Sequence, residues 1–558
     1  MHFFSKTGLI FLPFLLSLLF LAGSLTPSLI PRDWLVQGVL GGTVMALGYL
    51  IGRLIVTVWR LMDLPPLNKS VAMAVYCVCG LPVVAVLLWC LSKAHRWQNG
   101  IRERMGMALI DNTHTLQMLL VAFAVFAVFI LIGYALQYTF GLLRDFLYRY
   151  MPARTANVAG FILTAFIVLF VTRNGVLDHV ISGLDRSYTI GQALFDTAPP
   201  RPKGALVSGG QESLINWGAM GTPGRDYVLN GPKAADIAAF TGRDALQPIR
   251  VYAGLAQANT AQQRANIALA ELKRVGGFER EVLIIALPTG TGWLDPGAMD
   301  TVEYMHNGDI ATVSVQYSYL QSPLALILET ESGLNQAKAL ISSVQSYWRT
   351  LPRYHRPRLY IHGLSLGAWS SMHGADLFAL LNDPISGAFW AGPPFPSARW
   401  KSIMAKRDPN SPYVAPTIGN SRLVRFASHT KSPGGPTGWG DMRLVYLQYS
   451  SDPIVFYEPA SLFRAPAWMN EPAASDVSTD LRFIPVITQF QLAVDMVLAN
   501  TAPAGHGHAY YGPDYIRPWV AVTEPKNWTE SDSLRLIEQC DNGYMVGCDN
   551  GQFPSATD

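Results

Sequence analysis

The chain has few charged residues and few cysteines for its length. Of its 558 residues only 15% are charged and 50% are hydrophobic, which is too apolar for an ordinary soluble enzyme. The net charge of +3, with no basic stripe, argues against nucleic-acid binding. The sequence also lacks an H-E-x-x-H motif and paired C-x-x-C motifs, so no metal site is indicated. We therefore expect no metal, no cofactor and no nucleic-acid partner.

Long apolar runs are concentrated in the first third of the chain. Each is near the roughly 20 residues that a membrane helix needs. The runs are Leu9–Leu25, Leu35–Val58, Val71–Leu91, Leu116–Phe140 and Val158–Val171. They predict a transmembrane domain over residues 1–180 with about five helices. Two alternatives stay open: the first run could be a cleaved signal peptide, because Lys6 precedes a short apolar core, and the short last run could be an interfacial helix.

The second apolar run contains two pairs of glycines at the spacing G-x-x-x-G. Gly38 and Gly42 form one pair, and Gly48 and Gly52 form the other. This spacing removes side chains from one helix face and lets a neighbouring helix approach closely. It predicts a tight bundle, with a homo-oligomer through the transmembrane helices as a possible state.

Charges flanking the apolar runs slightly favour a cytoplasmic amino terminus. Five spans would then place everything after about residue 180 outside the cytoplasm. The only cysteines in that region are Cys540 and Cys548, spaced so that one disulfide could close the tail loop. We expect a multi-pass inner-membrane protein with the region after about residue 180 on the periplasmic side.

The segment Gly363–Gly367 has the pattern G-x-S-x-G, with Ser365 at its centre. It follows the short apolar strand Leu359–His362 and precedes a stretch of small residues. The pattern in this strand-turn-helix context is typical of a nucleophile elbow, in which flanking glycines make room for a sharp turn. Ser365 is therefore the candidate nucleophile.

A serine nucleophile needs a histidine as base and an acid that orients the histidine. Asp452 follows a predicted strand over residues 443–449, which is where the acid partner is expected. About fifty residues later, a glycine-flanked loop offers two histidines, His506 and His508. We favour His508 because an aromatic residue follows two positions later, and His506 remains the alternative.

Two segments are candidates for the oxyanion hole. One is the backbone N–H of Leu366, the residue after the nucleophile. The other is the loop Pro288–Trp293, which follows the apolar strand Val282–Leu287 and contains Gly290, Thr291 and Gly292. Aromatic residues near strand ends could line an acyl pocket, although such residues more often belong to the core. These candidates are Trp293, Tyr317 and Trp369.

Strands and helices alternate from about residue 246 onward. Strands are predicted at 249–252, 282–287, 311–317, 359–362 and 443–449, with helices at 260–275 and 333–348. This alternation indicates a mostly parallel sheet covered on both faces. We expect a linker and pre-core segment at 181–245, an α/β-hydrolase catalytic domain at 246–525, and a carboxy-terminal tail at 526–558.

With these motifs in view, the chain resembles a bacterial family of membrane-anchored alpha/beta-hydrolases. Members join an amino-terminal multi-helix membrane region to a carboxy-terminal serine-hydrolase domain. The matching segments span nearly the whole chain, and the family elbow often has glutamate where this chain has Leu364. The segments are Pro27–Arg32, Arg250–Leu255, Pro288–Trp293, Gln316–Leu320, the elbow, Ser451–Pro453 and Gly505–His508.

The resemblance implies a serine hydrolase without defining its substrate. The membrane anchor favours a lipid or lipid-linked acyl ester, because an enzyme held at the interface meets such molecules at high local concentration. Two alternatives remain: a transacylase that passes the acyl group to an envelope glycan or lipid, and a catalytically inactive α/β-hydrolase that serves as an envelope binding module.

Overall fold

The computed structural model describes residues 11–65, 67–170, 198–319, 330–375, 383–435 and 438–548. The chain divides into two compact units. The helical unit comprises Met1–Tyr188 and Pro459–Asp495, and the sheet unit comprises Thr189–Glu458 and Met496–Asp558. The expected continuous domain 246–525 is thus interrupted, because residues 459–495 cluster with the amino-terminal helices.

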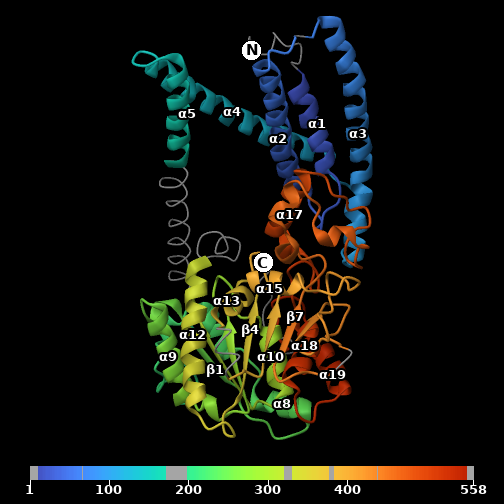
Figure 1. The fold of residues 1–558 in the computed structure, drawn as a ribbon. Helices are drawn as coiled ribbons and strands as arrows, with labels where there is room; N and C mark the ends of the chain where they lie inside the picture. The colour runs from blue at the N-terminus through green and yellow to red at the C-terminus, as the bar shows by residue number, and fades with distance from the viewer. Residues whose placement is uncertain are drawn as a thin grey trace. The chain divides into compact units, whose positions relative to one another are not determined.

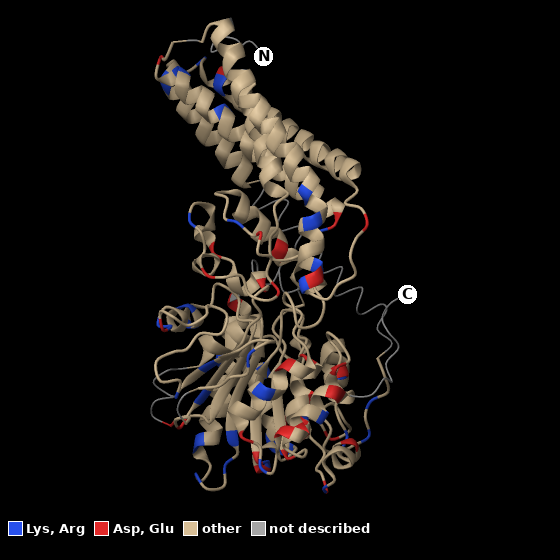
Figure 2. Ribbon diagram, turned by 90° about the vertical axis from the view of Figure 1, so that its right-hand side faces the viewer, with Lys and Arg blue, Asp and Glu red and all other residues tan. Residues whose placement is uncertain are grey.

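The helical unit begins with five apolar helices (Figure 1). They are α1 (Leu12–Ser24), α2 (Trp34–Leu61), α3 (Lys69–Arg104), α4 (Thr115–Leu147) and α5 (Ala153–Phe170). In the described ranges, four of them, α2 to α5, are long and apolar enough to cross a membrane. Figure 2 shows long stretches of these helices without charged residues. The first and last expected runs reach Leu9 and Val171, which lie outside the described residues, and α1 has 13 described residues.

The paired glycines of α2 lie against two different helices. A Cβ on Gly38 would stand 2.7 Å from the Cβ of Val121, and one on Gly42 would overlap the backbone oxygen of Ala122, both in α4. A Cβ on Gly48 or on Gly52 would likewise overlap the backbone of α1. Because backbone rather than flexible side chain is the neighbour in most of these contacts, larger residues would force the helices apart. The expected tight packing is therefore present within the bundle.

The sheet unit contains seven parallel strands in the order β1-β3-β2-β4-β5-β7-β6 (Figure 1). All five predicted strands are present, with β5 and β6 in addition. Nearly every strand residue is buried, as expected for a parallel sheet covered on both faces. The strands are β1 (Ile249–Ala253), β2 (Val282–Leu287), β3 (Ile310–Val315), β4 (Arg358–Leu364), β5 (Gly387–Ala391), β6 (Val424–Ala427) and β7 (Arg443–Leu447).

Helices cover both faces of this sheet. From β2 to β3 the chain moves along the sheet toward the β1 edge. From β1 to β2, and from β3 through β4 to β5, it moves toward the β6 edge. Right-handed crossovers therefore place α10 (Pro296–Met305) on one face, and α9 (Ala261–Arg274), α12 (Thr330–Thr350) and α13 (Leu366–Gly374) on the other. The helix α18 (Gly512–Thr523) packs with α10. The remaining described α-helices are α7 (Thr222–Leu229), α8 (Ala234–Thr241), α15 (Ala398–Met404), α16 (Pro453–Phe456), α17 (Ile487–Leu498) and α19 (Glu530–Cys540).

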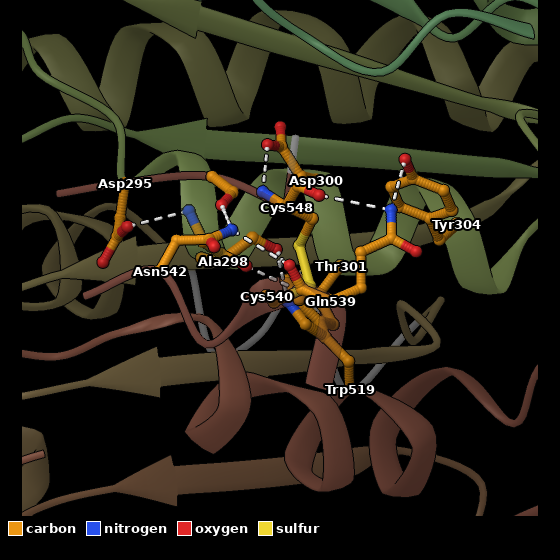
Figure 3. Close-up of a disulfide and its surroundings, with 12 residues drawn as sticks. Asp295, Ala298, Asp300, Thr301, Tyr304, Trp519, Gln539, Cys540, Asn542 and Cys548 are labelled. Atoms are coloured by element: carbon orange, nitrogen blue, oxygen red, sulfur yellow. Dashed lines mark hydrogen bonds between the residues drawn. A yellow bond between two sulfur atoms is a disulfide. The ribbon is translucent and has the colours of Figure 1, made fainter. Parts of the chain in front are cut away.

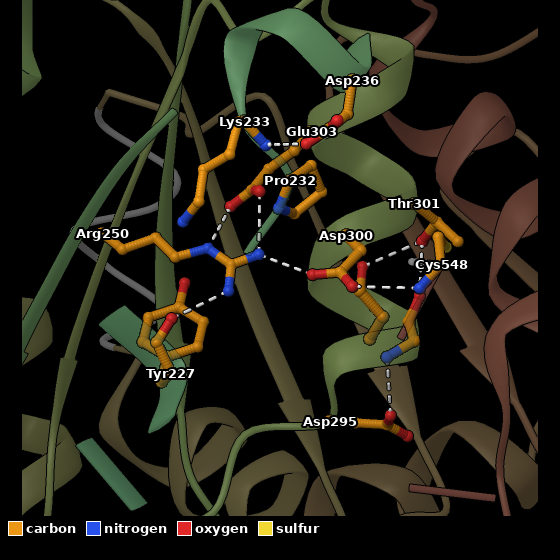
Figure 4. A network of polar contacts seen from close by, with 12 residues as sticks. Tyr227, Pro232, Lys233, Asp236, Arg250, Asp295, Asp300, Thr301, Glu303 and Cys548 are labelled. Atoms are coloured by element: carbon orange, nitrogen blue, oxygen red, sulfur yellow. Dashed lines mark hydrogen bonds and ion pairs between the residues drawn. The ribbon is translucent and has the colours of Figure 1, made fainter. Parts of the chain in front are cut away.

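A buried ionic network joins β1 to α10 (Figure 4). The Arg250 guanidinium lies 2.7 Å from Oε1 of Glu303 and 2.6 Å from Oδ1 of Asp300, and it also donates to the backbone oxygen of Tyr227. Burial raises the pKa of Glu303 to about 7 although Arg250 counteracts the shift. Loss of Arg250 would remove the main counter-charge of the two buried carboxylates and leave only the weaker attraction of Lys233, so we expect it to destabilise the network.

The expected disulfide between Cys540 and Cys548 is present and closes the loop after α19 (Figure 3). The Cys548 N–H donates to Oδ2 of Asp300 at 3.1 Å, and the Gln539 side chain donates to the Cys548 carbonyl at 3.2 Å. The disulfide therefore holds this loop against the buried network around Arg250.

Candidate active site

Ser365 occupies a strained turn between β4 and α13. Its backbone has φ 56° and ψ −122°, in a region that residues other than glycine rarely adopt. A Cβ on Gly363 would overlap the backbone of Gly367, and a Cβ on Gly367 would overlap the carbonyl oxygen of Leu287. Both glycines of the motif are thus required by close backbone approach. The turn presents Ser365 at the carboxyl end of β4, and this serine is 3% exposed.

Strand register brings the carboxyl ends of four strands to one level. Leu287 of β2 pairs with Gly363 of β4, Leu364 pairs with Ala391 of β5, and Ala391 pairs with Leu447 of β7. The Ser365 N–H extends this ladder by donating to Ala391 at 2.9 Å. Loops that follow these strands consequently gather beside Ser365, at the edge where parallel sheets commonly bind ligands.

Asp452 lies in the loop after β7 and is fully buried. Its Oδ1 atom accepts a hydrogen bond of 2.9 Å from the N–H of Ile454 and thereby caps the short helix α16. Its Oδ2 atom lies 2.7 Å from Nδ1 of His508 and accepts a second hydrogen bond of 2.9 Å from the Tyr510 hydroxyl. The carboxylate is therefore held at both oxygens, with one oxygen directed at the histidine.

The loop that carries His508 is anchored on both sides of this histidine. The His508 N–H donates to Ala499 at 2.8 Å, and the Gly507 N–H donates to the Ser451 hydroxyl at 2.8 Å. The imidazole is 4% exposed and lies against Gly392, where a Cβ would stand 2.7 Å from its Cε1 atom. Within the described ranges, Nε2 of His508 is buried and has no hydrogen-bond partner. One ring nitrogen is thus oriented by Asp452 while the other remains available.

His506, the alternative base, has different surroundings. Its ring packs at 5.2 Å from the ring of His429 and lies near Asp514. Burial raises the pKa of Asp514 to about 6, and His506 counteracts the shift. The structure thus pairs His508 with Asp452 and sets His506 among other groups.

In the loop Pro288–Trp293, some backbone N–H groups form hydrogen bonds within the loop, and others are available to an oxyanion. The Thr289 N–H donates to Trp293 at 2.9 Å, and the Gly292 N–H donates to Thr289 at 3.0 Å. The Gly292 N–H is therefore used within the loop in this structure, and its expected role as an oxyanion donor stays a prediction. The N–H groups of Gly290 and Thr291 have no such bond among the described residues.

Two buried side chains hold this loop in place. The Tyr252 hydroxyl donates to the Gly292 carbonyl at 2.7 Å, and the Gln316 amide donates to the Thr291 carbonyl at 3.0 Å. Gly292 has φ 89°, and a Cβ there would stand 2.5 Å from the Tyr252 hydroxyl, so glycine is required. Leu366 begins α13, where the first N–H groups of a helix lack partners within the helix.

The three aromatic candidates for a substrate pocket lie in separate elements. Trp293 is half-buried at the end of the 288–293 loop, and its ring lies 6.3 Å from that of Tyr544. Tyr317 follows β3 and is buried against Gly333. Trp369 is half-buried in the first turn of α13, where its N–H donates to the Ser365 carbonyl. Their role in substrate binding stays a prediction.

Three residues contribute to the site without having been assigned a role from the sequence. Tyr510 donates to Asp452, Ser451 anchors the histidine loop, and Gly392 leaves room for the His508 ring. Tyr510 and Ser451 lie within or beside motifs that were noted, namely the aromatic after His508 and the residue before Asp452. Gly392 had no local signal, because its requirement arises from a contact with a residue more than one hundred positions away.

A parallel seven-stranded sheet, a serine elbow after a central strand and a histidine-carboxylate pair at the same edge define the α/β-hydrolase class. Residues 249–536 match the protein family described as "Alpha/beta-hydrolase family". Residues 25–232 match the region described as "Alpha/beta-hydrolase family N-terminus". The chain therefore belongs to the alpha/beta-hydrolase family, as the sequence motifs predict. No curated protein and no solved structure matches it.

Proposed function

We propose that this protein is a membrane-anchored serine hydrolase that cleaves an ester of a lipid or lipid-linked acyl group. One observation carries the proposal: His508 has Nδ1 on Asp452 and a buried Nε2 without a partner among the described residues, at the sheet edge that also carries Ser365. This is the arrangement that a serine nucleophile requires of its base. Family membership supports hydrolase chemistry in general.

In the proposed reaction, the Ser365 hydroxyl attacks the ester carbonyl carbon and gives its proton to Nε2 of His508. Asp452 keeps the other ring nitrogen protonated and stabilises the imidazolium. The negative charge on the carbonyl oxygen is stabilised by the N–H of Leu366 and by those of Gly290 and Thr291. His508 then protonates the leaving alcohol, and water, activated by the same histidine, releases the acid from Ser365.

The lipid character of the substrate rests on the four long apolar helices of the helical unit. A catalytic unit tethered to a bilayer encounters lipid esters at high effective concentration. The disulfide between Cys540 and Cys548 supports an extracytoplasmic position for the sheet unit, because disulfides persist in oxidising compartments. Maleimide labelling of a cysteine introduced at the exposed residue Asp244, in intact and permeabilised cells, would report that side directly.

Fluorophosphonate labelling of isolated membranes tests the activated serine. We expect labelling of the native protein, loss of labelling in Ser365→Ala, and at least about a thousandfold slower labelling in His508→Ala. Two matched controls are Ser370→Ala, a buried serine in the same helix, and His506→Ala, in the same loop as the base; both should label normally. Absence of labelling in a folded native protein would contradict the proposal and favour a non-catalytic binding role.

Turnover of lipid esters then identifies the acyl acceptor. Release of free fatty acid from labelled phospholipid in detergent micelles would support hydrolysis. Product in which the acyl group has moved to an added glycan or lipid hydroxyl would instead show a transacylase that uses the same three residues.

A further inference from the structure

The helical unit contains a buried arginine that the proposed reaction does not use. Arg32 belongs to the connection between α1 and α2 and is 2% exposed. Its Nη2 atom donates to the Thr26 carbonyl at 3.0 Å and its backbone N–H donates to Gln98. Within the described part of the chain, Nε and Nη1 are buried without a hydrogen-bond partner. A buried guanidinium with two unused donors is costly unless an acceptor reaches it.

These donors belong to a side chain that lines a cavity of about 470 Å³. Arg102 of α3 lines the same cavity, and its Nε atom is also buried without a partner among the described residues. Gln37 and Gln98 add polar walls, and Trp34 and Met118 add apolar ones. Two arginines from different segments thus converge on one space, which is the arrangement that binds phosphate and carboxylate oxygens.

The charges around Arg32 are only partly balanced by the protein. Asp495 attracts Arg32, but the two carboxylate oxygens of Asp495 already accept hydrogen bonds from Ser28 and from the N–H of Leu29, both at 2.8 Å. The pKa of Arg32 is lowered by burial more than Asp495 restores it. Asp33 and Asp111 also line the cavity, but both are exposed, and Asp33 caps α2 through the N–H of Val36. Anionic oxygens at Nε and Nη1 would supply the missing counter-charge.

The cavity lies at one end of the apolar bundle. Its walls come from the connection after α1, the start of α2, the last turns of α3 and the start of α4. The apolar run of α3 ends near Leu91, and the charged residues Lys93, Arg96 and Arg102 follow. At about 1.5 Å per residue, the 36 residues of α3 exceed the roughly 30 Å hydrocarbon core. The polar end of α3 therefore corresponds to the level of lipid head groups.

We propose that Arg32 and Arg102 form a binding site for a phosphate-type anion, carried either on the head group of an anionic phospholipid or free in solution. This site is separate in sequence and in chemistry from Ser365, and its existence does not depend on the proposed hydrolase activity. Basic pockets between membrane helices are known to hold such head groups.

The test uses the full-length protein in nanodiscs of phosphatidylcholine, with phosphatidylglycerol or inorganic phosphate added as the probe. Thermal unfolding and native mass spectrometry report binding. We expect the native protein to retain phosphatidylglycerol, and both Arg32→Gln and Arg102→Gln to weaken retention by about tenfold or more. Arg96→Gln, an exposed arginine on the same helix that does not line this cavity, is the control and should bind as the native protein does.

The outcomes separate the two sources of the anion. Equal stabilisation by inorganic phosphate and by phosphatidylglycerol, lost in both cavity variants, would identify a free-anion site. Stabilisation by the lipid alone would identify a head-group site. No binding of either probe, or binding that both Arg32→Gln and Arg102→Gln leave unchanged, would overturn the proposal. Because Arg102 is half-buried, Arg102→Gln provides the decisive result should Arg32→Gln fail to fold.

Discussion

The Tyr510 hydroxyl donates a hydrogen bond of 2.9 Å to Oδ2 of Asp452. The same oxygen lies 2.7 Å from Nδ1 of His508, so the tyrosine and the histidine share one acceptor. A hydrogen bond from Tyr510 withdraws negative charge from this oxygen and restricts its position. Tyr510 is therefore a positioning residue for the proposed acid-base pair.

Replacing Tyr510 with phenylalanine should lower kcat/KM by roughly tenfold, the effect of one lost hydrogen bond to a charged group. The loss should fall mainly on kcat, because Tyr510 acts on the carboxylate that orients His508. The measurement is kcat and KM for an ester substrate, with the rate of fluorophosphonate labelling beside them.

Tyr449→Phe is the matched control for this variant. The Tyr449 ring stacks on that of Tyr510 at 4.2 Å, but its hydroxyl donates to Asp514 and not to Asp452. We expect this control to keep the kcat of the native protein. A similar loss of kcat in both variants would mean that ring packing, rather than the hydrogen bond to Asp452, positions the pair.

Gly367→Ala should destroy the elbow geometry, because the added methyl group would overlap the carbonyl oxygen of Leu287. Neither backbone can move without disturbing β2 or α13, so we expect a loss of about 1–3 kcal/mol or more in unfolding free energy. Fluorophosphonate labelling should be abolished. Gly438→Ala is the control, since a Cβ there meets no atom within 4 Å. Normal labelling of Gly367→Ala would show that the turn tolerates a side chain.

Titration of the Asp295 carboxyl should make the free energy of unfolding fall as pH rises. It caps α10 and accepts from the Tyr515 hydroxyl at 2.7 Å, and burial raises its pKa to about 7. In the unfolded chain an aspartate titrates near 3.9, so the folded protein binds the extra proton between about pH 4 and 7. Its stabilising contribution is therefore complete below about pH 4 and is lost as pH rises through 7.

Asp295→Asn removes this titration while keeping a capping oxygen. The unfolding free energy of the variant relative to the native protein should increase from pH 4.5 to pH 8, by up to about 3 kcal/mol at 1.36 kcal/mol per pKa unit. Denaturant unfolding at several pH values measures the difference. Asp244→Asn, which alters an exposed carboxylate, should show no such trend. Parallel profiles for native protein and Asp295→Asn would contradict the expectation.

Replacing Cys540 and Cys548 with alanine should reduce the unfolding free energy of the sheet unit by about 2–3 kcal/mol. The bond closes a loop with a sequence separation of 8, and the estimate follows from the chain entropy that such a closure removes from the unfolded state. Thermal unfolding with and without reductant measures the effect. Reductant should lower the Tm of the native protein and leave that of the double variant unchanged. An equal fall in Tm with reductant in both proteins would show that the reductant does not act through this disulfide.

Much of the candidate site could be predicted from the sequence because its signals are local. The elbow needs two glycines and a serine within five residues, between a strand and a helix, and steric demands confined to that turn explain the pattern. Asp452 directly follows a strand rich in β-formers. The strands β5 and β6 were missed because Gly387–Ala391 and Val424–Ala427 are short and lie among residues with no strong periodicity.

Other features depend on contacts between distant residues. His506 and His508 share one glycine-rich loop, and the hydrogen bonds from Gly507 to Ser451 and from His508 to Ala499 hold His508 beside Asp452. The use of the Gly292 N–H inside its own loop likewise depends on how Tyr252 and Gln316 hold that loop. The clustering of residues 459–495 with the amino-terminal helices has no local signal, because it arises from contacts such as Asp495 with Ser28.

By itself, the sequence determined the class of fold, the apolar helices and the identity of the candidate nucleophile, since hydrophobic period and turn sterics act over a few residues. Tertiary structure alone decided which histidine meets Asp452, which N–H groups remain available for an oxyanion, and that Arg32 and Arg102 line one cavity. The physical reason is the same in each case: burial and hydrogen bonding are satisfied by partners far away in the chain, and only packing determines which partner is reached.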